Sequence, residues 1–447
     1  MGDDLLRVGL LGLGTVGGSV YRLLAGEDGP AGPSPGRWAR VVRIAVREPG
    51  RDRPVSPPRE ILTADPLEVV DDPEVDVVVE AVGGLSPVLG LVARALRARK
   101  HVVTANKELM AHHGARLREL ARAQEVGLRC EASVGGAIPI LSSLEGPLAT
   151  ESVHQIIGVV NGTTNFVLSE MADRGLSLEE AVAAAERRGY AEADPERDLS
   201  GYDSACKMAI MAALAFGAPV DLKGVRFSGL EGIEADDLAL ARGWGYAVRL
   251  LGLARRIAGG AEILVAPHLV PSDHPLARVR GADNAIQIWG RSSGLLTLSG
   301  PGAGGPPTAT AVVGDLAAIA RGAGGFGGLP HAGAEALGTR QGECAFYLRV
   351  RAVDDPTLPG RLGEILTQHG VEPAGIVGRE ADGRRDWLVT TGPTGEDALR
   401  DAACIIEGLG AVRGPCTLLR FLPEDEEARP GVLGLRPARH PAGAEGS

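Results

Sequence analysis

The sequence predicts an α/β fold built on a doubly wound parallel sheet. Short, apolar, β-branched segments alternate with amphipathic segments of helical length, and a glycine-rich turn follows the first apolar segment. The apolar and charged fractions, 44% and 23%, are those of an ordinary globular protein. At about 150 residues per domain, the length of 447 residues suggests about three domains.

The first 135 residues are expected to form that sheet. Continuous apolar segments, which buried parallel strands require, occur at residues 5–11, 41–46, 75–82, 101–105 and 128–132. Helical segments follow the first, third and fourth of them, at residues 16–24, 87–97 and 109–124. This alternation places helices on both faces of the sheet.

After residue 136 the pattern changes to that of an α+β domain. Strands are expected at residues 152–159, 262–269 and 285–298, and helices at residues 177–188 and 201–216. The glycine-rich residues 300–305 then lead into a helix at residues 310–321. Seven glycines with little hydrophobic periodicity predict a linker over residues 322–341.

A βαββαβ pattern follows this linker, and that is the order of the ferredoxin-like fold. Its strands are expected at residues 345–352, 375–379, 387–391 and 417–421, and its helices at residues 360–369 and 396–409. Residues 424–447 are rich in proline, glycine, alanine and charged side chains, so we expect a disordered tail.

The composition narrows the class of function. A formal net charge of −11 argues against a protein that binds a phosphate backbone, and an aromatic fraction of 3% argues against base stacking. The cysteines show neither metal-ligand nor disulfide spacing; they are Cys130, Cys206, Cys344, Cys404 and Cys416. No run of about 18 apolar residues occurs and no basic segment precedes the first apolar run, so we expect a cytoplasmic protein without membrane segments.

The segment Gly12-Leu13-Gly14-Thr15-Val16-Gly17 lies between the first expected strand and the first helix. A pyrophosphate requires a tight turn, close approach of the backbone and free amides at a helix N-terminus. Gly12 and Gly14 suit the turn and the approach, and Gly17 suits close packing of helix on strand. The segment predicts a dinucleotide site; the alternative is a glycine-rich turn of an unrelated α/β protein.

The residues after the second strand bear on the choice of cofactor. Arg47 suits the 2′-phosphate of NADP, whereas Glu48 suits the ribose diol of NAD. We favour NADP, with NAD as the alternative. Arg47 could also be one solvated arginine of the loop that contains Arg51 and Arg53.

One lysine stands on a predicted helix with almost no polar face. Asp203 and Lys207 are four residues apart and share one side of helix 201–216, while Asp198 precedes the helix, where a carboxylate can cap free amides. The helix continues as MAIMAALAF, so Lys207 is expected to be buried and to need a partner. A lysine in such a pocket can donate a proton in catalysis; the alternative is a surface ion pair.

Three further segments contain candidate ligand-binding residues. Lys107 follows the fourth strand, at the sheet edge where doubly wound folds bind ligands, although it could simply begin the next helix. The bend at residues 131–139 could turn carbonyls toward a hard cation such as Na⁺, or be a tight loop. The polar run 161–165, with Asn161 and Thr163, suits a small polar ligand or a ribose, or a turn.

Together these segments resemble homoserine dehydrogenase. The matching stretches cover about residues 5–320, in the family's order: GLGTVG, TANKELMA, CEASVGGAIPI, GVVNGTTNFVLSEM, GYAEADPERDLSGYDSACKMAI and GPGAGGPPTAT. Residues 343–422 are similar to an ACT domain, a module for feedback by amino acids. Thr310 in place of a serine, Pro306-Pro307, and extra residues in DDPTLPGRLGEIL depart from the family patterns.

The resemblance implies reversible, NAD(P)-dependent reduction of L-aspartate 4-semialdehyde to L-homoserine in threonine and methionine biosynthesis. It implies that Lys207 donates a proton to the carbonyl oxygen and that Lys107 lies between cofactor and substrate. It also implies that Glu192 binds the substrate amino group, with Asp198 and Asp203 completing the site. Asn161 and Thr163 are expected at the substrate. The implied cofactor contacts are Gly12, Leu13, Gly14, Thr15, Val16, Gly17, Arg47, Lys107 and Gly302. The implied Na⁺ ligands are Glu131, Val134, Gly136 and Ile138.

The expected organisation combines these parts. A Rossmann-type NAD(P)-binding domain takes residues 1–135 and about 306–322, an α+β substrate, catalytic and dimerisation domain takes 136–305, and a linker takes 323–342. The ferredoxin-like ACT domain takes 343–423. We expect a homo-oligomer, a dimer or tetramer, with a threonine-type effector.

Two other functions fit part of the pattern. A Rossmann reductase of another small aldehyde would, if it used acyl chemistry, need a cysteine nucleophile with a base partner. A non-catalytic amino-acid sensor would be expected to have lost the pair Asp203 and Lys207, which is present.

Overall fold

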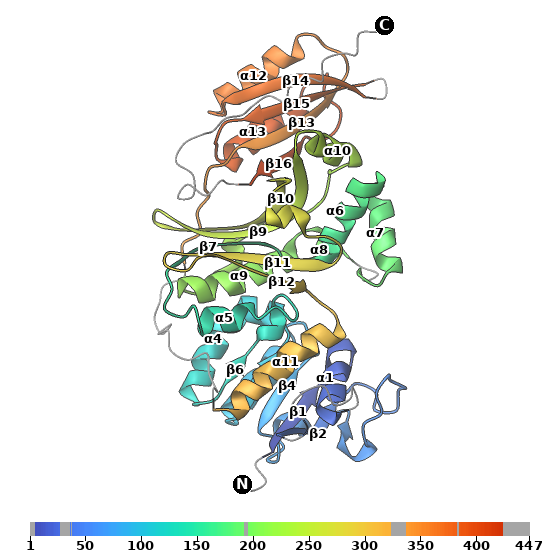
Figure 1. The fold of residues 1–447 in the computed structure, drawn as a ribbon, viewed down its shortest axis with the longest axis vertical. Coiled ribbons are helices and arrows are strands. Elements are labelled where there is room, and N and C mark those ends of the chain that lie inside the picture. Colours follow the sequence, from blue (N-terminus) through green and yellow to red (C-terminus); the bar gives the residue numbers. More distant parts are fainter. Residues whose placement is uncertain are drawn as a thin grey trace.

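The structure, a computed structural model, describes residues 5–26, 36, 38–191, 195–322, 337–381 and 384–422. Three units are stacked along its long axis (Figure 1). The N-terminal unit (residues 5–129 with 305–320) lies at the lower end, the middle unit (131–301) at the centre, and the C-terminal unit (346–421) at the upper end.

The N-terminal unit is a six-stranded sheet in which all paired strands are parallel. Its strands are β1 (Leu6–Leu11), β2 (Ala39–Ala45), β3 (Leu62–Thr63), β4 (Val77–Glu80), β5 (His101–Thr104) and β6 (Leu128–Arg129). The order β3-β2-β1-β4-β5-β6 confirms the doubly wound parallel sheet. Strand β4 is wholly buried because both faces of the sheet are covered, which explains its run of valines.

Helices cover this sheet. They are α1 (Thr15–Ala25), η2 (Arg59–Ile61), α2 (Leu67–Val70), α3 (Val88–Arg97), α4 (Lys107–Ala123) and α11 (Gly305–Ala320). Helix α11 comes back from the middle unit and packs beside α1 (Figure 1). It begins five residues before the expected helix at 310–321, because Pro306 and Pro307 occupy its first turn, where a proline loses no hydrogen bond.

The fifth expected strand, at 128–132, is shorter than predicted. Strand β6 ends at Arg129, and η3 (Glu131–Ser133) follows as a 3-10 helix. The backbone N–H of Glu131 donates to Asp315 Oδ2 of α11 at 2.9 Å, so the chain turns out of the sheet there.

The middle and C-terminal units share one ten-stranded sheet. The strands of the middle unit are β7 (Val153–Val159), β8 (Arg226–Phe227), β9 (Tyr246–Ile257), β10 (Gly260–Pro271), β11 (Asp283–Gly290) and β12 (Gly294–Pro301). The expected single strand at 285–298 is a hairpin of β11 and β12, because Gly294, at φ 65°, adopts the left-handed conformation that the turn requires.

Helices pack on this sheet. They are α5 (Ile140–Glu145), α6 (Gly162–Arg174), α7 (Leu178–Arg187), α8 (Glu196–Leu199), α9 (Tyr202–Phe216), η4 (Leu222–Gly224), α10 (Ala235–Gly243) and η5 (Pro275–Arg278). Helix α9 is buried along nearly its whole length against β7, β9 and β10. The sequence did not indicate α5, α6, α8, α10, β8 or β9.

The C-terminal unit has the element order βαββαβ. Its elements are β13 (Phe346–Ala352), α12 (Leu358–Gln368), β14 (Pro373–Ala381), β15 (Arg384–Thr391), α13 (Glu396–Glu407) and β16 (Thr417–Phe421). The strands lie in the order β16-β13-β15-β14, and β16 also pairs in parallel with β10 through His268–Arg420 and Leu269–Phe421. The last strand of the C-terminal unit therefore continues the sheet of the middle unit.

Parts of two expected segments cannot be compared. Residues 323–336 of the linker and all of the expected tail at 424–447 lie outside the described residues. Within the described ranges, every helix is too short or too polar to span a bilayer.

Candidate active site

Two lysines from different units meet at one carboxylate. Lys107 begins α4, directly after β5, while Asp203 and Lys207 lie in the first two turns of α9. Lys107 Nζ lies 2.5 Å from Asp203 Oδ1, and Lys207 Nζ lies 2.7 Å from Asp203 Oδ2. Asp203 thus joins the sheet edge of the N-terminal unit to the buried helix of the middle unit.

The surroundings of Asp203 stabilise its ionised form. Its side chain is 4% exposed, and burial alone would raise its pKa. The two ammonium groups outweigh burial and hold the pKa of Asp203 well below its usual value. Burial would likewise lower the pKa of Lys107, but Asp203 raises it above the ordinary lysine value. The cluster is therefore a charged one at neutral pH.

Asn161 connects the two aspartates. Its Nδ2 donates to Asp198 Oδ1 at 2.8 Å and to Asp203 Oδ2 at 2.9 Å. Its Oδ1 accepts the backbone N–H of Thr164 at 2.8 Å, which makes Asn161 the N-cap of α6. Asn161 is consequently fixed by the helix that follows it, and it fixes both carboxylates.

The position of Lys207 is set by a second contact that the sequence did not suggest. Its Nζ donates to the carbonyl oxygen of Val160 at 2.7 Å, at the end of β7. The side chain is only 10% exposed, which agrees with its place on an almost wholly apolar helix.

Three other expected substrate residues have different outcomes. Asp198 lies within α8 and bonds to Asn161, so it does not cap α9, whose N-cap is Gly201. The Thr163 hydroxyl donates to the Tyr190 carbonyl at 2.7 Å. Glu192 lies outside the described residues.

Polar contacts beside the lysines hold the two units together, and sequence reasoning missed them. Glu108 of α4 pairs with Arg197 of α8 at 2.7 Å, and His112 Nε2 lies 3.0 Å from the Tyr202 hydroxyl. Glu108, Arg197 and Tyr202 stand in the matching stretches TANKELMA and GYAEADPERDLSGYDSACKMAI. Nothing in the spacing of those stretches indicated which residues would pair.

A cavity of about 810 Å³ opens above the glycine-rich turn. Residues 11–15, from the end of β1 into that turn, line it together with residues 45–47 at the end of β2. Gly12 has φ 91°, and a Cβ on Gly17 would lie 2.1 Å from the Gly12 carbonyl oxygen. Only glycine allows α1 to approach the turn this closely, as the sequence predicted.

Four arginines and one aspartate, Asp52, line this cavity. Arg47 lines it, and so do Arg22, Arg51 and Arg53, which the sequence gave no reason to choose. Glu48 is not among the lining residues; its carbonyl oxygen accepts from Arg53 Nη2 at 2.6 Å.

Gly302, Val16 and Gly17 do not line the cavity, whereas Gly305 and Pro306 do. A Cβ on Gly302 would lie 2.1 Å from the Asn284 side chain, which accounts for a glycine at this position. Contact of Gly302 with a cofactor stays a prediction.

The bend after β6 has backbone geometry that requires glycine. Gly136 has φ 59°, and a Cβ on it would lie 2.6 Å from the Pro301 carbonyl oxygen. The Glu131 carboxylate accepts the backbone N–H groups of Leu141 and Ser142 at 2.9 and 2.6 Å, and burial raises its pKa. In the described ranges no three His, Cys, Asp or Glu side chains are grouped so as to hold a metal ion. A Na⁺ site there would depend on carbonyl oxygens.

Two family models match the chain. The model described as "Homoserine dehydrogenase" matches residues 139–317, and the one described as "Homoserine dehydrogenase, NAD binding domain" matches residues 12–131. The chain is 36% identical to the homoserine dehydrogenase of Pseudomonas aeruginosa over 93% of this chain and 98% of that protein. It is 42% identical to that of Bacillus subtilis over 70% of this chain and 72% of the relative.

Solved structures of homoserine dehydrogenases are also similar to this chain. A homoserine dehydrogenase from Thiobacillus denitrificans superposes with a TM-score of 0.82 at 36% identity, over 93% of this chain and 98% of that chain. A hyperthermophilic archaeal homoserine dehydrogenase in complex with NADPH gives a TM-score of 0.59 at 27% identity, over 70% of this chain and 97% of that chain.

Proposed function

The chain belongs to the homoserine dehydrogenase family, oxidoreductases that act on a CH–OH group, and on this premise we propose which of its residues carry the reaction. The reaction interconverts L-aspartate 4-semialdehyde and L-homoserine with a nicotinamide cofactor. Family membership sets aside a non-catalytic sensor and a reductase of another aldehyde.

The cofactor, when bound, supplies the hydride, and the chain supplies the proton and the positioning. Lys207 holds the proton that the carbonyl oxygen takes up during reduction. Asp203 holds Lys207 and Lys107 in place, Asn161 holds Asp203 and Asp198, and Glu192 binds the substrate amino group. The observation that carries this assignment is the shared carboxylate, 2.5 and 2.7 Å from the two ammonium groups.

Initial rates with L-aspartate 4-semialdehyde test the assignment. Lys207→Ala is expected to lose nearly all kcat while retaining cofactor affinity, because the hydride would arrive without a proton donor. Lys100→Met is the matched control, since Lys100 is also buried and also donates to a main-chain carbonyl, that of Val75 at 2.8 Å. Wild-type turnover in Lys207→Ala would reject Lys207 as the donor.

The cofactor we propose is NADP. The support is the group of arginines around Arg47, since a guanidinium pairs well with a phosphate. Arg47→Gln is expected to raise the KM for NADPH at least about tenfold and to leave the KM for NADH nearly unchanged. Arg40→Gln, an exposed arginine of the neighbouring strand, serves as the control. Equal changes in the KM for NADPH and the KM for NADH would mean that Arg47 is only a solvated arginine of the loop.

We also propose a Na⁺ site formed by Glu131, Val134, Gly136 and Ile138. Its support is the chemistry of the donors, a buried carboxylate and carbonyl oxygens, which hard cations bind. The ion would balance the buried charge of Glu131. Sodium chloride is expected to raise the Tm above that in choline chloride at equal ionic strength, and Glu131→Gln is expected to remove the difference. Equal Tm values for the wild type in both salts would overturn the site.

We further propose that residues 343–423 are a ferredoxin-like ACT module that binds a threonine-type effector. The βαββαβ order and the strand order β16-β13-β15-β14 support this. Threonine at millimolar concentration is expected to slow the reaction and raise the Tm; no change in either would reject the effector. We propose a dimer or tetramer that uses the sheet edges β12 and β14, with light scattering as the test.

For the other two domains we propose that residues 1–135 with 306–322 bind the cofactor and that residues 136–305 bind the substrate. The packing of α11 beside α1 supports the first of these.

A further inference from the structure

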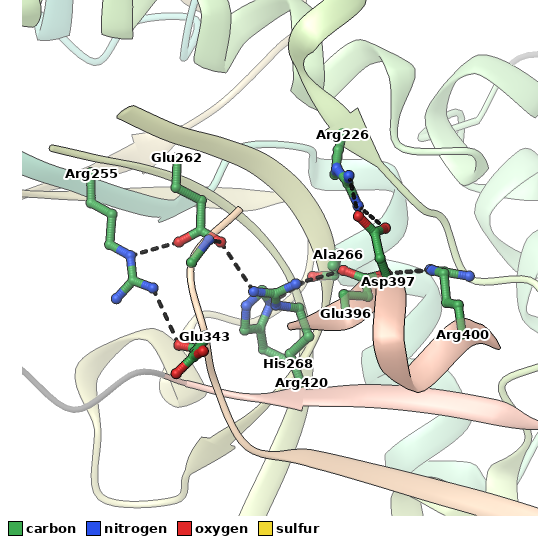
Figure 2. Close-up of polar contacts among 11 residues, drawn as sticks. Arg226, Arg255, Glu262, Ala266, His268, Glu343, Glu396, Asp397, Arg400 and Arg420 are labelled. Atoms are coloured by element: carbon green, nitrogen blue, oxygen red, sulfur yellow. Dashed lines mark hydrogen bonds and ion pairs between the residues drawn. The ribbon is translucent and has the colours of Figure 1, made fainter. Parts of the chain in front are cut away.

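A chain of alternating charges crosses the junction between the middle and C-terminal units (Figure 2). Glu262 of β10 accepts from Arg255 Nε at 2.6 Å and from Arg420 Nη2 at 3.3 Å. Arg420 of β16 also donates to Glu396 at 2.6 Å, and Arg400 donates to the same carboxylate at 2.6 Å. This chain contains three arginines and two glutamates, so it carries an excess of positive charge.

A cavity of about 260 Å³ adjoins this chain of charges. Its lining consists of Lys223, Gly224, Arg226, residues 262–264, residues 339–341 and Arg420, so both units contribute to it. One water needs only about 10–15 Å³ of such space, so the cavity has room for a small organic or inorganic ion.

The lining is cationic. Lys223, Arg226, Arg340 and Arg420 face a single acid, Glu262. Both oxygens of Glu262 are already engaged, because Oε2 accepts from Arg255 and Oε1 accepts from Arg420 and the backbone N–H of Gly342.

Not all of these cations have a partner. Arg226 is neutralised by a bidentate pair with Asp397 at 2.5 and 2.8 Å. The side chains of Lys223 and Arg340 have no acidic partner within the described ranges. The charge of these two side chains is therefore available to a ligand.

Arg420 gives an independent indication of a missing acceptor. Its side chain is 4% exposed, and its Nε is buried without a hydrogen-bond acceptor among the residues that the structure describes. A buried guanidinium N–H without an acceptor is unfavourable relative to a satisfied one. Oxyanions are good acceptors for guanidinium N–H groups, and Arg420 is one of the residues that line the cavity.

We propose that this cavity binds a small anion with a carboxylate or phosphate group, held by Lys223, Arg340 and Arg420. The site is distinct from the cofactor cavity and from the shared carboxylate of Asp203, and it lies between units rather than within the proposed effector module. An anion there ties η4 of the middle unit to β16 of the C-terminal unit, because Lys223 lies in η4 and Arg420 in β16.

Titration of the full-length protein with inorganic phosphate and with succinate tests the site, by calorimetry and by Tm, against sodium chloride at equal ionic strength. We expect saturable binding of at least one anion. The double variant Lys223→Gln/Arg340→Gln is expected to weaken it at least about tenfold, since each charged hydrogen bond contributes more than that factor. Both residues are exposed, so the variant should fold.

The matched control is Arg97→Gln/Arg116→Gln, which removes two exposed charges from α3 and α4. Anion binding at the cofactor or substrate site would persist in both double variants, so only a loss confined to the first supports the proposal. Binding of phosphate alone identifies a phosphate-bearing ligand, and binding of succinate alone a carboxylate. No saturable binding beyond chloride, or equal binding by the wild type and the first variant, would overturn it.

Discussion

Replacement of Asp203 by asparagine isolates the charge at the centre of the active site. Asparagine keeps the shape of the side chain but leaves the ammonium groups of Lys107 and Lys207 facing a neutral amide. In the wild type these groups lie 2.5 and 2.7 Å from the carboxylate, which is 4% exposed. The substitution therefore removes one partner from a buried ion cluster without opening a cavity.

The expected loss of stability is about 3 kcal/mol. Removal of one partner from a buried pair costs about 3–5 kcal/mol. The lower end applies because the amide oxygen still accepts a hydrogen bond and because the Val160 carbonyl continues to hold Lys207 Nζ at 2.7 Å. If the proton donor is displaced to the same extent in the transition state, about 3 kcal/mol corresponds to roughly a hundredfold loss of kcat.

Thermal unfolding and initial rates measure both effects. Asp173→Asn is the matched control, since Asp173 also pairs with two arginines, at 3.1 and 2.6 Å, but is 43% exposed and should contribute less than about 1 kcal/mol. The folded pKa of Asp203 is lowered, so its contribution is complete above the unfolded pKa, about 3.9, and is lost as pH falls below it. The Tm gap between the wild type and Asp203→Asn should shrink in acid. A kcat within threefold of the wild type, with a Tm equal to that of Asp173→Asn, would refute the reasoning.

Three further substitutions test separate parts of the molecule. Gly17→Ala places a Cβ 2.1 Å from the Gly12 carbonyl oxygen, so the affinity for NADPH should fall at least about tenfold in a fluorescence titration. An unchanged affinity would contradict the argument that only glycine at position 17 lets α1 approach the turn. Burial lowers the pKa of His268 to about 3, so between pH 6.5 and 3 the unfolded chain binds a proton that the folded chain does not. The free energy of unfolding therefore falls by up to about 1.4 kcal/mol for each unit by which the pH is lowered in that range. The Tm gap between the wild type and His268→Phe should narrow from pH 7.5 to pH 5, and a constant gap would exclude this titration. Arg349→Lys replaces a buried bidentate pair with Asp237, at 2.8 and 2.9 Å, by a single contact. The Tm should fall by the equivalent of about 2 kcal/mol, with kcat retained. An unchanged Tm would show that this pair does not stabilise the junction between the middle and C-terminal units.

The sequence predicted the N-terminal sheet well because its strands are buried on both faces. A segment such as β4 must then be continuously apolar, and its short length and β-branched valines indicate a strand rather than a helix. Helix α9 was predicted at residues 201–216, and its apolar sequence predicted that Lys207 would be buried and paired, because a buried lysine needs a partner.

Elements with mixed composition were not predicted. Helix α6 begins with the polar run after Asn161, which resembles a turn until its capping bond to Thr164 is known. Strand β9 contains Arg249 and Arg255, which look solvent-exposed in sequence but are buried or half-buried through bonds to Ala277 and Glu262. Those partners lie elsewhere in the chain, and local patterns contain no information about them.

The same limit applies to the site. Lys107 and Asp203 were chosen separately, but their contact joins two units, and the arginines around Arg47 become a cluster only once the loop after β2 is folded. Spacing along the chain indicated which residues carry chemistry, whereas their pairing depends on tertiary structure.

The pairing of β10 with β16 has a consequence for synthesis of the chain. The ribosome releases β10 well before residues 417–421, so the edge of the sheet at His268 and Leu269 stays open while the C-terminal unit is still being made. An open edge is a template for pairing with another chain. A nascent chain that stalls before Thr417 therefore exposes this strand edge to other nascent chains on the same messenger RNA. Once β16 is synthesised, it pairs with β10 and covers the edge.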